Sequence, residues 1–211
     1  GRTGALAEML AKAGALVLHT DPFLPNVEYA RARRGLPSQV LKLTEVNTLA
    51  NIEAGSFDVV IALSVHLLAH VLSPRDTLEK IRTVLKPGGL LFLDEKDIGY
   101  PVRYKSGSIY SSGRAHLFHF TVETVAASLE TAGYEIVSCE LDKSRSTGFR
   151  HIKLVARNPV DRGVPAIKRH VVQPKNILTK LRHAERKKWA ILVKKAIRRS
   201  LKQLTKARRA R

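Results

Sequence analysis

The sequence predicts an α/β chain with a doubly wound, mostly parallel sheet, a closing antiparallel hairpin and a basic helical C-terminal extension. Residues 57–63 form an apolar run rich in Val and Ile, which is typical of a strand buried on both faces of a parallel sheet. A helical segment, the turn Lys86-Pro87-Gly88-Gly89 and a second apolar run at Leu90–Leu93 follow. A strand, a crossover helix and a second strand form the unit of such a sheet, whose ligands bind at the carboxyl ends of the strands.

The segment before this unit is predicted to contain one helix and two short strands. Ala5–Ala13 is rich in Ala and Leu and is followed by a glycine, which is typical of a helix with a C-terminal cap. Ala15–Leu18 and Val40–Leu43 are the expected strands. Residues 23–39 are expected to be irregular, apart from a short helix near Val27–Arg33.

The crossover helix is predicted to begin at Ser73-Pro74, because serine is a preferred N-cap and proline is favoured in the first turn. Its apolar residues recur at helical spacing and should pack on the sheet. They are Leu78, Ile81, Val84 and Leu85.

After the second strand, residues 95–117 show no clear period. Long ordered segments of this kind are often functional, so we expect a lid over an acceptor site. Thr121–Ala132 is predicted to be an amphipathic helix. Tyr134–Leu141 and Arg150–Ala156 are predicted strands, and the short connection between them favours an antiparallel hairpin.

The charge of the chain divides it into two parts. Of the 211 residues, residues 1–157 hold 19 Lys and Arg against 16 Asp and Glu, whereas residues 158–211 hold 18 against 2. We therefore expect a nearly balanced domain over 1–157 and a basic linker and helical tail over 158–211. The tail could contact nucleic acid, an anionic membrane surface or an adjacent domain, or it could be a solvated linker helix.

The single cysteine, Cys139, excludes an internal disulfide and is typical of a reducing compartment. The sequence shows no signal peptide and no apolar run of membrane-spanning length. The expected location is therefore the cytoplasm, with no transmembrane segment.

Five segments of residues 1–157 together resemble the class I S-adenosylmethionine (SAM) dependent methyltransferases, which have a Rossmann-like fold. The segments are Gly1–Leu10, Asp21, Ser56–Val60 (SFDVV), Val84–Gly89 (VLKPGG) and His119–Tyr134 (HFT, then AGY). The resemblance places Gly1 inside the family's glycine loop, after its first strand. We therefore expect either a fragment or a sheet that is gapped where that strand belongs, since the neighbouring strands would lack backbone partners there.

The resemblance implies that SAM is the cofactor, and it implies a set of binding residues: Gly1, Gly4, Asp21, Pro22, Glu45, Val46, Ala62, Leu63 and Ser64. Asp21 would accept hydrogen bonds from the ribose hydroxyls, or it caps the loop before Pro22. Gly1 and Gly4 would approach the methionine part of SAM, or they form an ordinary turn. Either Glu45 or Asn47 would bind the amino group of the adenine.

His70 and His116 are the candidate catalytic residues. His70 could act as a general base on an acceptor hydroxyl, or it is a packing histidine at a helix start; His66 is a weaker candidate. His116, like Arg114, could lie in the acceptor site. His116 and His119 are three residues apart, but no nearby cysteine or acid pair completes a metal site, so no metal is expected.

The function predicted from this resemblance is transfer of the SAM methyl group to a small-molecule or glycan acceptor. Such a transfer depends mainly on alignment and proximity. The alternative is an impaired methyltransferase-like scaffold whose basic tail binds an anionic partner, either nucleic acid or a membrane surface. A nicotinamide-dependent oxidoreductase would fit Asp21 but fits the final hairpin less well.

Overall fold

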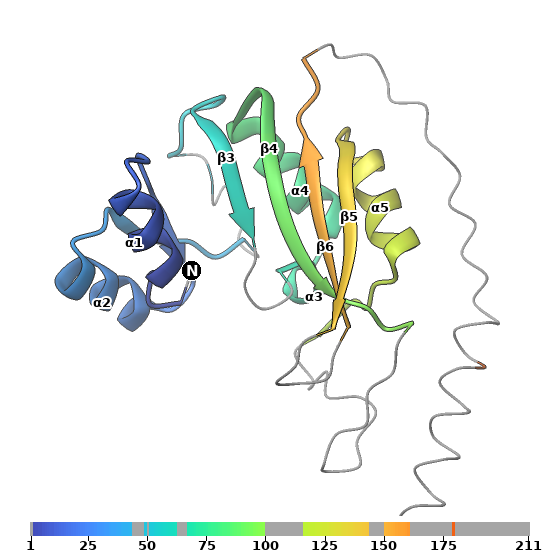
Figure 1. The fold of residues 1–211 in the computed structure, drawn as a ribbon, viewed down its shortest axis with the longest axis horizontal. Coiled ribbons are helices and arrows are strands. Elements are labelled where there is room, and N and C mark those ends of the chain that lie inside the picture. The colour runs from blue at the N-terminus through green and yellow to red at the C-terminus, as the bar shows by residue number, and fades with distance from the viewer. Residues whose placement is uncertain are drawn as a thin grey trace, which may run out of the picture.

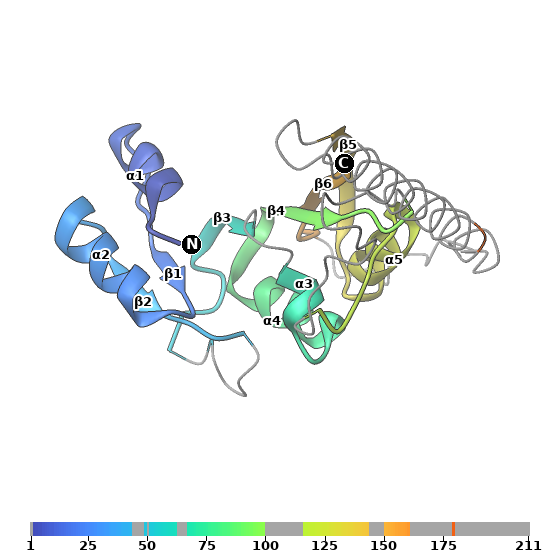
Figure 2. The same cartoon turned by 90° about the horizontal axis from the view of Figure 1, so that it is seen from below.

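A computed structural model describes residues 2–43, 49, 51–62, 67–99, 116–143, 150–160 and 179. These residues contain a two-stranded parallel sheet and a four-stranded mixed sheet with the order β3-β4-β6-β5. Figure 1 shows the four-stranded sheet with its helices, and Figure 2 also labels β1 and β2. The strands are β1 (His19–Asp21), β2 (Ser38–Val40), β3 (Phe57–Ala62), β4 (Leu85–Lys96), β5 (Glu135–Lys143) and β6 (Arg150–Arg157).

The four-stranded sheet is built around β4, which pairs with β3 in parallel and with β6 antiparallel. The predicted strand, helix and strand unit is confirmed, because α4 (Pro74–Val84) connects β3 to β4. The predicted hairpin is also confirmed, and β6 lies between β4 and β5 rather than at the edge. The sheet therefore combines one parallel pair with two antiparallel ones.

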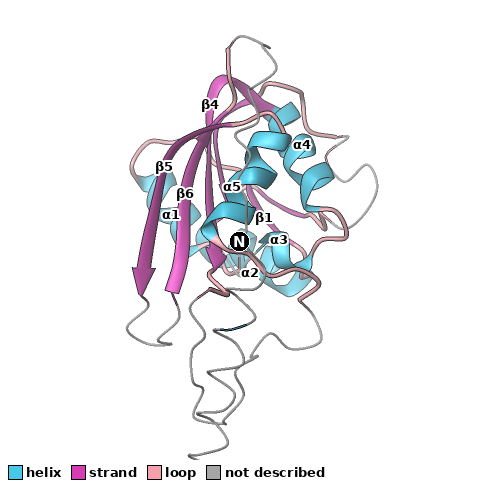
Figure 3. Ribbon diagram, turned by 90° about the vertical axis from the view of Figure 1, so that its right-hand side faces the viewer, coloured by secondary structure: helices cyan, strands magenta, loops and turns pink. Residues whose placement is uncertain are grey.

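Helices α4 and α5 (Val122–Thr131) cover one face of this sheet, as Figures 2 and 3 show from two directions. The hydroxyl of Ser73 accepts a hydrogen bond from the Asp76 amide at 3.2 Å, which confirms the predicted N-cap of α4. Thr121 and Thr124 form a reciprocal capping box at the start of α5. The core between sheet and helices includes Leu78, Ile81, Leu91, Leu93, Leu129, Tyr134, Ile152 and Leu154.

The Lys86–Gly89 turn forms an irregularity between β3 and β4. The register passes from Phe57 opposite Leu85 to Val59 opposite Leu90, so the turn residues bulge out of the ladder. A side chain at Gly89 would lie 2.9 Å from the Lys86 carbonyl oxygen. The amide of Gly88 donates to the Asn158 carbonyl at 2.7 Å, and the Asn158 amide donates to the Gly89 carbonyl at 2.8 Å. The turn thereby holds the chain that leaves β6.

The N-terminal sheet corrects two predictions. The strand expected at Ala15–Leu18 is instead β1, because the ladder pairs His19 with Ser38 and leaves Leu16 fully exposed. The strand expected at Val40–Leu43 ends at Val40, as β2. Each shift follows from cross-strand pairing, which a short apolar run cannot specify.

Helices α1 (Ala5–Lys12) and α2 (Leu24–Arg34) accompany β1 and β2. The α1 helix confirms the prediction, whereas α2 is much longer than the short helix expected there. Only Val27 and Ala30 of α2 are buried, so the sequence lacks the apolar stripe that identifies most helices. The Arg31 Nε atom donates to the Ser38 carbonyl oxygen at 2.8 Å and ties α2 to β2.

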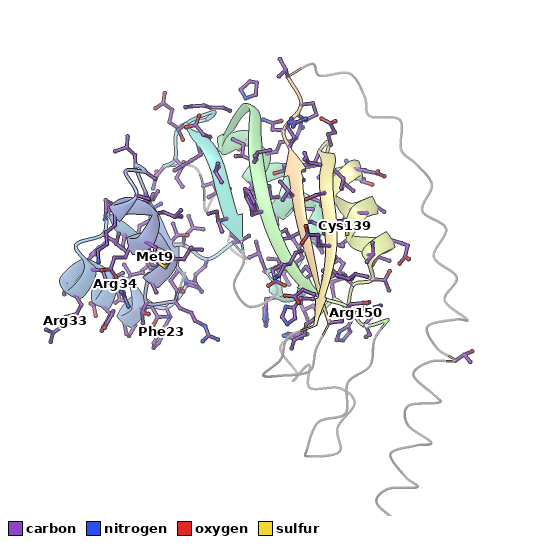
Figure 4. All side chains as sticks on the ribbon, viewed as in Figure 1. Met9, Phe23, Arg33, Arg34, Cys139 and Arg150 are labelled. Atoms are coloured by element: carbon purple, nitrogen blue, oxygen red, sulfur yellow. The ribbon has the colours of Figure 1, made fainter. Side chains whose placement is uncertain are left out.

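Among the residues that the structure describes, no strand connects β1 with β3, so the two sheets share no ladder. The expectation that β3 is buried on both faces is wrong. Val60 and Ala62 pack against the core, but Val59 is 41% exposed and Ile61 38% exposed. Met9 of α1 is also exposed, as Figure 4 shows. Apolar side chains remain uncovered on both sides of the gap.

Two predictions lie largely outside the described residues: the lid, from residue 100 to 115, and the basic tail over 158–211, of which only residues 158–160 and 179 are described. Over the described ranges, no helix is both long and apolar enough to span a membrane.

We predict that Gly4→Ala destabilises the fold more than Gly14→Ala. Both glycines have positive φ, of 78° and 92°, which costs an L-residue about 1–2 kcal/mol. A Cβ at Gly4 would also lie 2.8 Å from the Leu36 side chain, whereas one at Gly14 meets no atom within 4 Å. Overpacking should add about 1–3 kcal/mol. Urea unfolding measures both variants, and equal losses would contradict the packing argument.

Candidate functional site

The candidate site lies at the carboxyl ends of β3 and β4. Ala62 ends β3, and Glu95 and Lys96 end β4. The short helix α3 (Leu67–His70) lies at the same end of the sheet (Figure 1). In open α/β sheets this edge is where ligands bind.

Glu95 is a buried acid, with 1% of its surface exposed. One of its carboxyl oxygens accepts a hydrogen bond from the Leu68 amide at 2.7 Å. Burial raises the pKa of Glu95 to about 8; the Leu68 hydrogen bond and Lys96 oppose this shift, and Asp94 adds to it. The carboxyl is therefore mostly protonated at neutral pH.

Three histidines gather beside this end of the sheet. The rings of His70 and His116 meet edge to face, with centroids 4.5 Å apart and planes at 79°, and His119 lies 6.3 Å from His116. Burial lowers the pKa of His116, and the neighbouring His70, Lys96 and His119 lower it further. The imidazole of His116 is therefore neutral at pH 7 and can accept a proton.

The segment that bears His116 and His119 is attached at both ends. The Leu117 amide donates to the Ala69 carbonyl of α3 at 2.7 Å, and the Ile98 amide donates to the Phe120 carbonyl at 2.8 Å. Beyond β4, the carboxylate of Asp97 accepts a hydrogen bond from the Arg150 Nε atom at 2.6 Å; Arg150 is labelled at this end of the sheet in Figure 4. These contacts fix the histidines relative to α3 and β4.

Asp21 ends β1 and is 6% exposed. Its Oδ1 atom accepts hydrogen bonds from the Phe23 amide and the Asn26 side chain, both at 3.0 Å, and its Oδ2 atom accepts one from the Arg2 amide. Burial acts to raise the pKa of Asp21, but the three hydrogen bonds outweigh it and lower the pKa. The hydrogen bonds from Phe23 and Asn26 show that Asp21 caps the loop that begins at Pro22. This loop cap was the alternative to ribose binding.

The other predicted cofactor residues are only partly described. Gly4 is the N-cap of α1 in a left-handed conformation, Pro22 is exposed beside Asp21, and Ala62 ends β3. The remaining candidates lie outside the described residues: Gly1, Glu45, Val46, Leu63 and Ser64, together with Asn47, His66 and Arg114.

Sequence reasoning missed Glu95 and Lys96. The alternation of Leu91, Leu93 and Glu95 would have placed the acid on the core face, and this signal was available. Among the residues that the structure describes, no group of three or more His, Cys, Asp or Glu could hold a metal ion.

The fold is similar to that of solved SAM-dependent methyltransferases, and the first part of the chain is similar to curated methyltransferases. Residues 1–93 match the family model described as "Methyltransferase domain". An O-methyltransferase of ubiquinone biosynthesis from Methylocella silvestris is 38% identical over 91 residues, which are 42% of this chain and 34% of that protein. The corresponding enzyme from Xanthomonas axonopodis pv. citri is 38% identical over 93 residues, 43% of this chain and 38% of that protein. The chain thus spans about a third of the length of these relatives.

Solved structures show the same fold. A SAM-dependent methyltransferase from Methanosarcina mazei superposes with a TM-score of 0.58 at 18% identity, over 75% of this chain and 89% of that chain. A 1,6-didemethyltoxoflavin-N1-methyltransferase from Burkholderia thailandensis, with its acceptor and S-adenosylhomocysteine bound, superposes with a TM-score of 0.56 at 16% identity, over 74% and 67% of the two chains.

The described residues fit SAM in part. A buried carboxylate ends β1, and a glycine with φ of 78° begins the first helix, so a ribose and an amino-acid group have suitable partners. Because Oδ1 of Asp21 already accepts two hydrogen bonds, a ribose hydroxyl would meet Oδ2 or replace Asn26 at Oδ1.

We predict that Asp21→Asn destabilises the chain at pH 7 but not in acid. The pKa of Asp21 is lowered from its usual 3.8, so its stabilisation is fully present above pH 3.8 and is lost as the pH falls through the lower folded value. Urea unfolding of both proteins at several pH values tests this. Unfolding curves whose difference is the same at every pH would contradict it.

We predict the opposite pH dependence for Glu95. Its pKa rises from 4.5 to about 8 on folding, so the folded chain holds an extra proton between these values and loses stability as the pH rises. Glu95→Gln cannot ionise, and should gain stability relative to the wild type from pH 5 to pH 8. Glu140→Gln, at an exposed position on β5, is the control and should follow the wild type. A constant difference between Glu95→Gln and wild type would disprove the assignment.

Proposed function

We propose that this chain is the catalytic domain of a methyltransferase that transfers the methyl group of SAM to an oxygen or nitrogen of a small-molecule or glycan acceptor. The observation that best supports this is the contact between His70 and His116 at the carboxyl end of the sheet. Sequence analysis named both residues as catalytic candidates, although they are distant in the chain.

At the donor end, Gly4 and Asp21 bind and orient the cofactor. The start of α1 directs backbone N–H groups toward a carboxylate, and Asp21 binds the ribose. Pro22 and Ala62 border the same site, and Gly1, Glu45, Val46, Leu63 and Ser64 complete the proposed set. Bound SAM supplies an electrophilic methyl group on its sulfonium, so the protein contributes mainly alignment.

At the acceptor end, His116 accepts a proton from the acceptor group. Its lowered pKa keeps the imidazole neutral at pH 7, and His70 holds the ring from one side. Loss of the proton would make the acceptor oxygen or nitrogen more nucleophilic, so that it takes the methyl group as the bond between that carbon and the sulfonium sulfur breaks.

The relatives support this acceptor class. Two of them are named as O-methyltransferases, which favours a hydroxyl, and a structural neighbour is named as an N1-methyltransferase, which supports nitrogen as the other candidate. The glycan alternative rests on the sequence resemblance. The single Cys139 supports a cytoplasmic location.

One observation favours the scaffold alternative. Asp21 ends a strand of one sheet and Ala62 ends a strand of the other, with no described strand between the two sheets. A chain with a divided donor site could act through residues 158–211, the proposed basic tail, and hold an anionic partner.

Calorimetric titration with S-adenosylhomocysteine tests the proposal. We predict that the wild type binds and that Asp21→Asn weakens binding by about 10- to 100-fold, since a hydrogen bond to a charged group contributes about 1.5–3 kcal/mol. Asn26→Ala is the matched control. It removes a neighbour of the same carboxylate and should change affinity less than about twofold, because Oδ1 becomes available to the ribose.

Circular dichroism must show that each variant is folded. A folded wild type that does not bind would contradict the methyltransferase and favour the scaffold. Equal weakening by both substitutions would mean that Asp21 acts only through its loop.

A further inference from the structure

Glu95 is a buried acid that methyl transfer does not use directly. It lies on the core face of β4, opposite Ile152 of β6, and both residues are almost completely buried. Its neighbours on the same face of β4 are the core residues Leu91 and Leu93. A carboxyl group in such surroundings is costly unless it makes a specific contact.

That contact is the backbone of α3. The Leu68 amide at the start of this four-residue helix donates to Oε1 of Glu95 at 2.7 Å. Leu68 is fully buried, so water cannot replace this acceptor. The first amides of a helix have no partner within the helix, and Glu95 provides one.

The same helix determines where the histidines lie. His70 is its last residue, and the carbonyl of Ala69 accepts hydrogen bonds from the amides of Leu117 and Phe118, at 2.7 Å and 3.4 Å. A shift of α3 would therefore move His70 and release the backbone next to His116. The contact between the two rings, 4.5 Å between centroids, depends on the position of α3.

We propose that Glu95 is a positioning residue that holds α3 on β4 and thereby keeps His70 against His116. The role rests on the proposed function, because it matters for catalysis only if these histidines serve the acceptor. The raised pKa of Glu95, about 8, agrees with it. A protonated carboxyl can accept the Leu68 hydrogen bond without placing a full charge in the core, while Asp94 and Lys96 are the charged neighbours along the strand.

Three substitutions separate this role from general stability. Glu95→Gln keeps the length of the side chain and a carbonyl oxygen that can accept from Leu68. Glu95→Asp keeps the carboxyl but is shorter by one methylene. Leu129→Ala removes a core side chain of α5 and leaves the Glu95 carboxyl and the α3 backbone unaltered.

The readout is the pKa of His116, followed by NMR of the histidine ring protons across pH, with His116→Gln to assign the signal. His116 is partly buried beside His70, so loss of that packing must return its pKa toward the usual 6.5. We expect a higher His116 pKa in Glu95→Asp than in the wild type. Glu95→Gln and Leu129→Ala should keep the wild-type value.

A second measurement follows the hydrogen bond itself. Hydrogen exchange of the Leu68 amide should be slow in the wild type and in Glu95→Gln, and at least tenfold faster in Glu95→Asp. An unchanged His116 pKa in a folded Glu95→Asp variant would overturn the proposal. So would a Glu95→Gln variant that behaves like Glu95→Asp, and so would equal effects of Leu129→Ala. If Glu95→Asp does not fold, exchange of the Leu68 amide decides: slow exchange in the wild type and in Glu95→Gln supports the contact, and fast exchange in either protein overturns the proposal.

Titration of S-adenosylhomocysteine into the same variants distinguishes the two proposals. Glu95 is not among the proposed cofactor residues, so affinity should change less than about twofold in Glu95→Gln and Glu95→Asp. Absence of binding in every protein would reject the methyltransferase and leave the histidine result intact. Normal binding with an unchanged His116 pKa would reject only the positioning role.

Discussion

The backbone pairing of β4 is the interaction on which the rest of the structure depends. This strand is hydrogen-bonded to β3 on one side and to β6 on the other, and its core face supplies Leu91 and Leu93 to the hydrophobic cluster. Helices α4 and α5 pack on that face, and α3 is attached to its carboxyl end through Glu95. The strand therefore connects the hydrophobic core to the histidines. A change in the packing of β4 would shift α3, and with it His70, through the hydrogen bond to Glu95.

The absence of a described strand beside β3 affects how the two sheets are stabilised. A central strand of a parallel sheet is normally covered and paired on both sides, yet Val59 and Ile61 of β3 are substantially exposed. The two sheets share no ladder among the described residues, so neither stabilises the other through backbone hydrogen bonds. A cofactor that contacted both sheets would have to hold them in one relative arrangement. Part of its binding free energy would be spent on that constraint.

The sequence predicted the core of the fold well, and it predicted the site less well. Phe57–Ala62, Pro74–Val84 and the final hairpin follow from apolar runs and turn residues whose preferences are strong. The short β1 and β2 were misplaced because three-residue strands are defined by their partners and not by composition. His70 and His116 were named separately, and only the folded chain brings them together. Glu95 was overlooked because an acid on a core face contradicts the usual distribution of charge.

The hydrogen bonds between Asn158 and the Gly88–Gly89 turn determine where the chain leaves the sheet relative to the histidines. This attachment lies at the amino end of the ordered part of β4, whereas the histidines lie at its carboxyl end. Seven residues of strand separate Gly89 from Lys96, a distance of roughly 20 Å at 3.3 Å per residue. A compact acceptor cannot touch both ends of that strand at once. The chain therefore leaves the sheet at the end of β4 that is opposite to the histidines.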